Sequence, residues 1–142
     1  MKRMPFFRRT EKGQSAAMFA IVATALVLFV IGVMEYMVTT SRMMEAVAVA
    51  DLAAHAGAQE VRVLPNGVIT PTGAGPAVAR QYFDLQAPEY VELTSVWCGV
   101  RNDRPACEVG ARVRTAGYLL GRQYVNVSAV GYLAYGVTRG DQ

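Results

Sequence analysis

The sequence predicts an α+β fold, in which a long N-terminal transmembrane helix continues as a stalk and is followed by a small antiparallel β-sheet domain. Two observations lead to this fold class. Residues 16–34 contain no charged side chain, and Thr24 is the only polar residue among them. Beyond residue 60, short segments alternate apolar and polar residues, which is typical of a sheet with one buried face. We therefore expect three parts: a basic cytoplasmic leader over 1–13, the helix over 14–60, and an extracytoplasmic α+β domain over 61–142.

The apolar segment is long enough to cross a bilayer as a helix. At about 1.5 Å per residue it spans roughly 28 Å, which matches a hydrocarbon core. Many of its residues are β-branched, but a single segment in lipid can satisfy its backbone hydrogen bonds only as a helix. The alternative is a cleaved signal peptide, whose apolar region is usually shorter and is followed by a small-x-small site. Residues 33–37, VMEYM, contain no such site, so we expect the helix to be retained.

The basic residues indicate how the helix is oriented. Five of the 14 basic residues and only one of the 11 acidic residues precede Gly13, so this segment is net positive and the remainder is slightly negative. A basic cluster beside an apolar segment stays in the cytoplasm. This predicts a single-pass protein of the inner (cytoplasmic) membrane, with the lipid bilayer as a partner and the C-terminal domain in the periplasm or outside the cell. No basic stripe follows that would track a phosphate backbone, so nucleic acid is not an expected partner.

The helix is expected to continue beyond the bilayer to about Gln59. Between Glu35 and Gly57 there is no Pro or Gly, and Ala, the best helix former, is frequent. Small side chains let a helix approach its neighbour closely. One apolar face, with members three to four residues apart, is formed by Met43, Val47, Ala50 and Ala54. This face packs either on a copy of the chain or a partner, or on the chain's own β-domain.

The domain begins with a predicted β-hairpin and a short helix. Residues 61–63 and 68–70 flank Pro65-Asn66-Gly67, in which Asn-Gly is a strong turn signal. Pro76 has a fixed backbone angle that suits the first turn of a helix. We therefore expect a helix over 77–85.

Three longer strands are expected at 90–98, 107–115 and 124–135, with a turn of helix within 117–122. In each strand, alternate residues share a face that packs most simply against the long helix. These residues are Val91, Leu93 and Trp97 in the first strand, Val109, Ala111 and Val113 in the second, and Val125, Val127, Ala129 and Leu133 in the third.

The two cysteines, Cys98 and Cys107, predict a structural disulfide. They lie at the end of one expected strand and the start of the next, and residues 99–106 between them read as a polar loop of a hairpin. The predicted topology places them in an oxidising compartment. Closing a loop of about ten residues contributes on the order of 2–3 kcal/mol. A metal site would need at least two more ligands, and a redox pair would usually be spaced CxxC.

No motif for catalysis or cofactor binding is present. The GxSxG, HExxH, P-loop and GxGxxG patterns are absent, so no catalytic, cofactor-binding or metal-binding residue is predicted and an enzyme is not expected. His55 lies between alanines on the stalk and is expected to be solvated or interfacial. Some aromatic residues belong either to the core and cross-strand pairs or to a binding face. They are Trp97, Tyr118, Tyr124, Tyr132 and Tyr135.

Three segments carry a resemblance to a known family. Residues 9–15, RTEKGQS, followed by AAMFAIV at 16–22, combine a basic stretch, a Gly, a small polar pair and an apolar helix. Residues 51–58, DLAAHAGA, form an Ala-rich stretch, and residues 124–130, YVNVSAV, form a closing strand. Together they resemble TadE/TadG-like proteins, which are pilin-like components of tight-adherence (Flp-type) pilus systems in bacteria. The resemblance covers the first 60 residues well and the remainder loosely.

The resemblance implies a processing site and a function. Type IV pilin-like precursors are cut by a prepilin peptidase after a Gly, and the matching bond is Gly13–Gln14. Pilins and many TadE-like proteins carry Glu five residues after the cut, where this chain has Met18, whereas TadG-like members often lack that Glu. We therefore expect a minor pilin-like (pseudopilin) or pilus-assembly protein of a tight-adherence or type IV-like secretion system. Its partners would be other pilin-like or pilus-assembly subunits and the prepilin peptidase. The alternative is a membrane-anchored extracytoplasmic binding module unrelated to pili.

Overall fold

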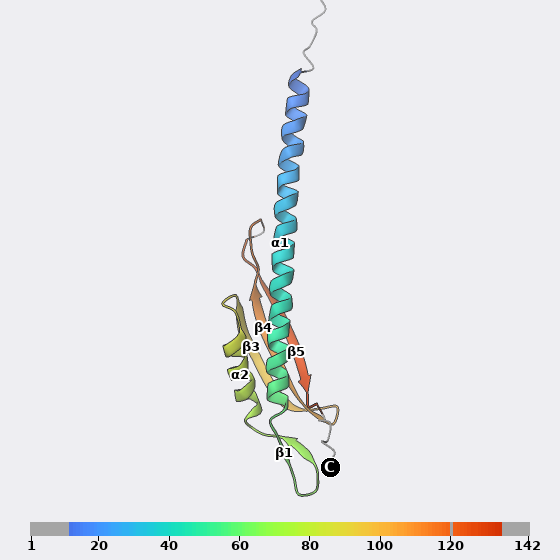
Figure 1. The fold of residues 1–142 in the computed structure, drawn as a ribbon, viewed down its shortest axis with the longest axis vertical. Coiled ribbons are helices and arrows are strands. Elements are labelled where there is room, and N and C mark those ends of the chain that lie inside the picture. Colours follow the sequence, from blue (N-terminus) through green and yellow to red (C-terminus); the bar gives the residue numbers. More distant parts are fainter. Residues whose placement is uncertain (1–11, 120, 135–142) are drawn as a thin grey trace, which may run out of the picture.

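The computed structural model describes residues 12–119 and 121–134, which form one long helix and a small α+β domain (Figure 1). The helix α1 spans Lys12–Ala58. The domain follows as β1 (Val61–Val63), β2 (Ile69–Pro71), α2 (Gly75–Gln86), β3 (Val91–Arg101), β4 (Arg104–Arg114) and β5 (Tyr124–Tyr132). The predicted α+β class, with one long apolar helix before a small antiparallel sheet, is confirmed.

The domain lies along the C-terminal half of α1, and the N-terminal half projects beyond it (Figure 1). The main sheet has the order β3-β4-β5, and both pairs of strands are antiparallel. α1 packs against β4 and β5, and α2 packs against both α1 and β3. β1 and β2 form a separate hairpin at the end of the domain farthest from the projecting helix (Figure 1).

Small residues of α1 form much of the core. Ala46, Ala50, Ala53 and Ala54 are fully buried beneath the sheet residues Val109, Ala111 and Val113, and Phe83 of α2 closes the side. The stalk face was therefore predicted in part. Ala50 and Ala54 are buried, but Val47 is exposed, because the buried stripe follows Ala46, Val49 and Ala53 instead. This stripe packs on the chain's own domain, one of the two partners considered for it.

The alternation predicted for β4 is confirmed, since Val109, Ala111 and Val113 are buried. The face predicted for β3 is wrong at Trp97, which is 49% exposed. The register of β3 against β4 shifts between Leu93 and Ser95. A bulge adds one residue to a strand and reverses which side chains face inward, so Val96 and Cys98 point toward the core in place of Trp97.

The predicted polar loop at 99–106 is replaced by a tight hairpin. β3 continues to Arg101 and β4 begins at Arg104, so only Asn102 and Asp103 connect them. Both residues have positive φ, 52° and 59°, as in the two-residue turns whose twist matches that of the flanking strands. At the other end of the sheet, β5 ends at Tyr132 and Leu133 lies beyond it; Tyr135 lies outside the described residues.

Candidate functional site

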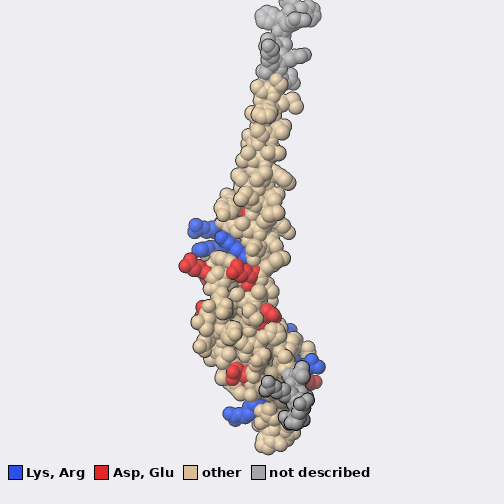
Figure 2. Space-filling view, viewed as in Figure 1, with Lys and Arg blue, Asp and Glu red and all other residues tan. Residues whose placement is uncertain are grey.

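The N-terminal half of α1 presents apolar side chains to its surroundings on all sides. From Met18 to Met34 most of its large residues are exposed, and Phe19 and Phe29 are among the most exposed. Thr24 donates its hydroxyl hydrogen to the carbonyl oxygen of Ala20 at 2.9 Å, so its polar group is satisfied within the helix. Among the coloured residues on the face shown in Figure 2, charged side chains are confined to the domain and the adjoining part of the helix. By length and composition, α1 is suited to cross a membrane.

The connection between β4 and β5 extends along α1 toward this apolar half (Figure 1). Its neck is closed by two hydrogen bonds: Thr115 N–H donates to the Gln123 carbonyl at 2.8 Å, and Gln123 N–H donates to the Thr115 hydroxyl at 3.0 Å. Gly117 and Gly121 have positive φ and turn the chain. The turn of helix predicted within 117–122 is absent from the described residues, because these two left-handed glycines interrupt helical geometry.

Glu35 fastens the tip of this loop to α1. The Leu119 backbone N–H donates to the Glu35 carboxylate at 2.8 Å, and Glu35 is the buried acidic residue of α1. One turn toward the N-terminus, Leu119 lies beside Gly32: its Cδ1 would be 3.7 Å from a Cβ atom at that position, an ordinary van der Waals contact. Between the neck and the helix there is a hollow of about 410 Å³, lined mainly by Gly32, Tyr36, Thr39, Leu119 and Val125. The apolar surfaces of helix and loop that meet here surround the Glu35 carboxylate. We call this contact between helix and loop the collar.

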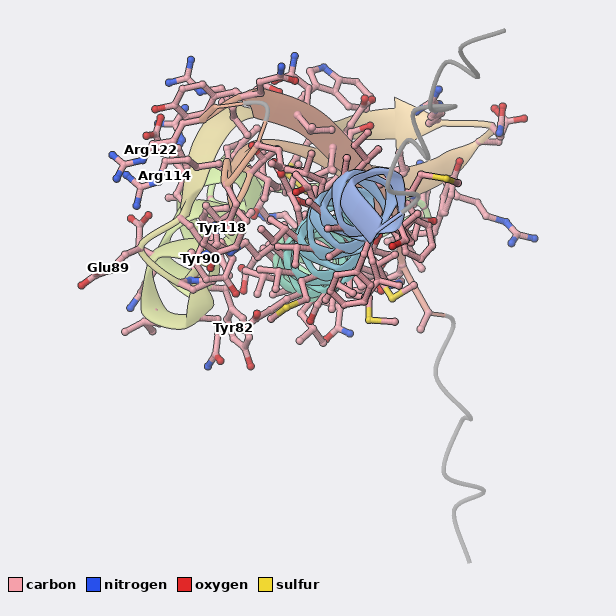
Figure 3. The ribbon with its side chains drawn as sticks, turned by 90° about the horizontal axis from the view of Figure 1, so that it is seen from above. Tyr82, Glu89, Tyr90, Arg114, Tyr118 and Arg122 are labelled. Carbon is pink, nitrogen blue, oxygen red and sulfur yellow. A yellow bond between two sulfur atoms is a disulfide. The ribbon has the colours of Figure 1, made fainter. Side chains whose placement is uncertain are left out.

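A second polar cluster lies where α1 meets the top of the sheet. The Arg42 guanidinium lies 4.8 Å from the centre of the Tyr90 ring and donates to the Arg114 carbonyl at 3.1 Å. The Tyr90 hydroxyl donates to the Glu45 carboxylate. That hydrogen bond, followed by burial and the negative charge of Glu45, raises the pKa of Tyr90 above 10, while Arg42 opposes the shift. Viewed from the helix N-terminus, Tyr90, Arg114, Tyr118 and Arg122 lie on one side of α1 (Figure 3).

The residues of the implied processing site lie at the start of the helix. Gly13 and Gln14 are in the first turn of α1, and Met18 is an exposed residue one turn later. The structure therefore places the implied cleavage bond at the end of α1 farthest from the domain (Figure 1).

The predicted disulfide residues face each other in the β3–β4 hairpin. Cys98 pairs with Cys107 across the two strands, their Cα atoms are 4.0 Å apart, and the two sulfurs are bonded. Cys107 is fully buried and lies against the helix, where a Cβ atom on Gly57 would meet its sulfur. The disulfide therefore joins β3 to β4 beside the C-terminal end of α1.

The aromatic candidates do not gather into one binding face. Trp97 lies over Gly99 on the outside of β3, and the Tyr124 ring packs under the Arg112 guanidinium at 4.6 Å. Tyr118 lies in the loop beside α1, beyond the end of the sheet at which β5 begins with Tyr124. His55 lies 3.6 Å from Asp51 one turn away on α1. Within the part of the chain that the structure describes, no group of three or more His, Cys, Asp or Glu side chains is arranged to hold a metal ion.

Sequence reasoning missed Glu35 and Leu119 as partners. From the sequence, no partner is assigned to Glu35, and only a turn of helix and one candidate aromatic residue, Tyr118, are predicted in the loop. A usable signal was the apolar pair Tyr118-Leu119 placed between two glycines in a loop. No family model, curated protein or solved structure matches this chain.

Proposed function

We propose that this chain is a minor pilin-like or pilus-assembly protein of a tight-adherence or type IV-like secretion system, anchored in the inner membrane by α1. It acts structurally, through helix packing and an exposed β-domain. The observation that carries the proposal is the division of α1 into two halves. One half has a buried alanine stripe against the domain, and the other half has a free apolar surface.

The division fits a subunit that joins a bilayer to an assembly. A lone apolar helix can leave a bilayer without great loss only if other apolar helices replace the lipid around it, and small residues favour such close packing. The apolar half of α1 includes Ala20, Thr24 and Ala25 along the side of a shallow groove. A neighbouring helix could approach α1 most closely at this groove, because the side chains there are small.

Met18 bears on which kind of subunit this is. In the resembling family a Glu at this position can neutralise the new N-terminal amine of a neighbour after cleavage. A buried charge without its partner is destabilising, so Met18 favours a minor or initiating position over a repeated one. The same substitution is compatible with an assembly factor that keeps its leader.

N-terminal sequencing of the protein purified from its native membrane tests the proposal. An N-terminus at Gln14 would support pilin-type processing, with a Gly13→Asp variant as the uncleaved control. An intact leader, together with co-purification of pilin-like subunits, would support the assembly-factor form. An intact leader with no such partner in crosslinked membranes would contradict the proposal.

The alternative function, a membrane-anchored binding module, is favoured by one observation. Trp97 is exposed on the outer side of β3, remote from the collar. Exposed aromatic residues are frequent contributors to binding energy at interfaces. A Trp97→Ala variant that keeps assembly intact but loses surface adhesion would favour this alternative.

A further inference from the structure

The tip of the β4–β5 loop lies at the depth of the membrane segment. If residues 16–34 fill the hydrocarbon core, Gly32 is about 3 Å inside its outer boundary, at 1.5 Å per residue. Leu119 approaches α1 at Gly32, and Tyr118 and Leu119 share a hollow with Ile31 and Met34. The loop tip is therefore level with the last turn of the apolar segment.

The two side chains at this tip are exposed and suited to a lipid interface. Tyr118 is 65% exposed and Leu119 is 47% exposed. Tyrosine is enriched at membrane interfaces, because its ring is apolar and its hydroxyl remains hydrated. Their apolar surface is continuous with that of Ile31 and Met34, so whatever covers the helix there also covers the loop.

The polar groups of the collar are compatible with this depth. A backbone N–H in hydrocarbon needs a partner, and the Leu119 N–H has the Glu35 carboxylate. The carboxylate in turn is buried between helix and loop instead of facing outward. This hydrogen bond thus gives one backbone N–H of the loop tip a partner at the level where water is scarce.

Two arginines stand on the same side of α1 as this tip. Arg114 ends β4 and Arg122 follows the tip, and both side chains point outward beside Tyr118 (Figure 3). Neither side chain has a hydrogen bond or ion pair with another residue in the ranges that the structure describes. On the face shown in Figure 2, coloured basic side chains lie where the apolar helix enters the domain. Guanidinium groups bind phosphate oxygens in a planar, two-pronged geometry.

We propose that the β4–β5 loop is a second membrane contact, in which Tyr118 and Leu119 enter the outer interface of the bilayer while Arg114 and Arg122 bind lipid phosphates. The proposal rests on the membrane span of the proposed function. It gives the domain a fixed tilt and height above the bilayer, because the loop, fastened to α1 by the hydrogen bond between Leu119 and Glu35, adds a second contact on one side of the helix.

The test uses the full chain in nanodiscs of phosphatidylcholine and phosphatidylglycerol, with an environment-sensitive dye on single introduced cysteines. Cys98 and Cys107 are bonded to each other and do not react under non-reducing conditions. The sites are Tyr118→Cys in the loop, Phe29→Cys in the anchor and Val63→Cys in the far hairpin. We expect the dye at 118 to be quenched several-fold by a nitroxide near the lipid headgroup. The dye at 29 should be quenched by a deep nitroxide, and the dye at 63 by neither.

The outcomes separate the loop contact from the span. If the dye at 29 is quenched and the dye at 118 behaves like that at 63, the loop proposal is wrong and the span stands. If the dye at 29 is not quenched, the span itself fails and the loop proposal fails with it. If the dye at 118 is shielded from both lipid nitroxide and aqueous iodide, a protein surface covers the loop, which also overturns the proposal.

The arginines are tested in the same system. Removing one juxtamembrane arginine weakens the attraction to anionic lipid by a factor of about five. We expect Arg114→Gln and Arg122→Gln each to lower the ratio of inserted to hydrated dye at 118 by about this factor. Arg62→Gln, in the far hairpin, is the matched control and should leave the ratio unchanged. An unchanged ratio in the Arg114 and Arg122 variants would overturn the phosphate contact.

Discussion

Gly131 sets how closely α1 lies against the sheet. A Cβ atom there would be 2.4 Å from the His55 backbone nitrogen and 2.5 Å from the Ala54 carbonyl carbon. These are backbone atoms, so no side-chain rotation can relieve the clash. We expect Gly131→Ala to lower the free energy of unfolding by about 1–3 kcal/mol, as overpacking does in a dense core, measured by denaturant titration of the purified protein.

Gly73→Ala is the matched control for that substitution. Nothing lies within 4 Å of a Cβ atom at Gly73, so we expect a change within about 0.5 kcal/mol. Equal stabilities for the two variants would show that α1 is not held as closely to β5 as the structure indicates.

The hydrogen bond from Tyr90 to Glu45 predicts a pH dependence. The folded pKa of Tyr90 is raised above its ordinary value of 10.0, mainly by this hydrogen bond. The fold favours the protonated phenol, so the contribution is complete below about pH 10 and is lost as the pH rises through the folded pKa. In a tyrosinate absorbance titration, we expect one late-titrating tyrosine that disappears in Tyr90→Phe and moves toward its ordinary pKa in Glu45→Gln.

Tyr82→Phe is the control for that titration, since Tyr82 is an exposed tyrosine of α2 for which no hydrogen bond is found among the described residues. The Tyr82→Phe variant should leave the late-titrating group in place. A late-titrating group that persists in Tyr90→Phe would contradict the assignment.

The β3–β4 hairpin is the element in which sequence and structure differ most. Alternation predicted β4 correctly, because every second residue from Val109 to Val113 is apolar. It failed on β3, because a bulge leaves no mark in the pattern until its position is known, and Val96 and Trp97 are both apolar. The turn was hidden in a polar run, although Asn102-Asp103 is the pair there that best tolerates positive φ.

The disulfide is expected to stabilise this hairpin. Cys98 and Cys107 are nine residues apart, and closing a loop of about this size contributes roughly 2–3 kcal/mol by restricting the unfolded chain. We expect the double variant Cys98→Ala, Cys107→Ala to lose at least this much stability in thermal unfolding. Reductant should destabilise the natural protein to a similar extent and leave the double variant unchanged.

Mass spectrometry after alkylation under non-reducing conditions checks the bond directly. Protein recovered from the extracytoplasmic side should carry no alkylated cysteine. Two alkylated thiols in that material would contradict the disulfide and remove the reason for the expected loss.

At the scale of the molecule, the sequence predicted the long helix but not the contact that the β4–β5 loop makes with it. The apolar run and the alanine-rich run could be recognised separately, because each has a composition that favours helix in its own solvent. The collar could not be recognised, because it joins Glu35 to Leu119 across 84 positions of sequence. No local pattern reports a pairing at that separation, and only the path of β4 and β5 brings the two residues together.

One substitution in each half of α1 tests whether that half is surrounded by lipid or by water. Leu28 is 51% exposed and Leu52 is 55% exposed, and both lie on the same continuous helix. In water, an exposed Leu→Arg change alters stability by no more than about 0.5 kcal/mol. In the centre of a bilayer, an Arg raises the free energy of insertion by about 2.5–3.5 kcal/mol.

We therefore expect Leu28→Arg to reduce membrane insertion by two orders of magnitude or so and Leu52→Arg to leave it unchanged. Carbonate extraction of membranes, with both variants expressed at the same level, measures this directly. Equal retention of the two variants would mean that both halves of α1 face the same solvent. The free apolar surface near the N-terminus would then be a site for a protein partner, and the loop at Tyr118 would lose the bilayer that it is proposed to enter.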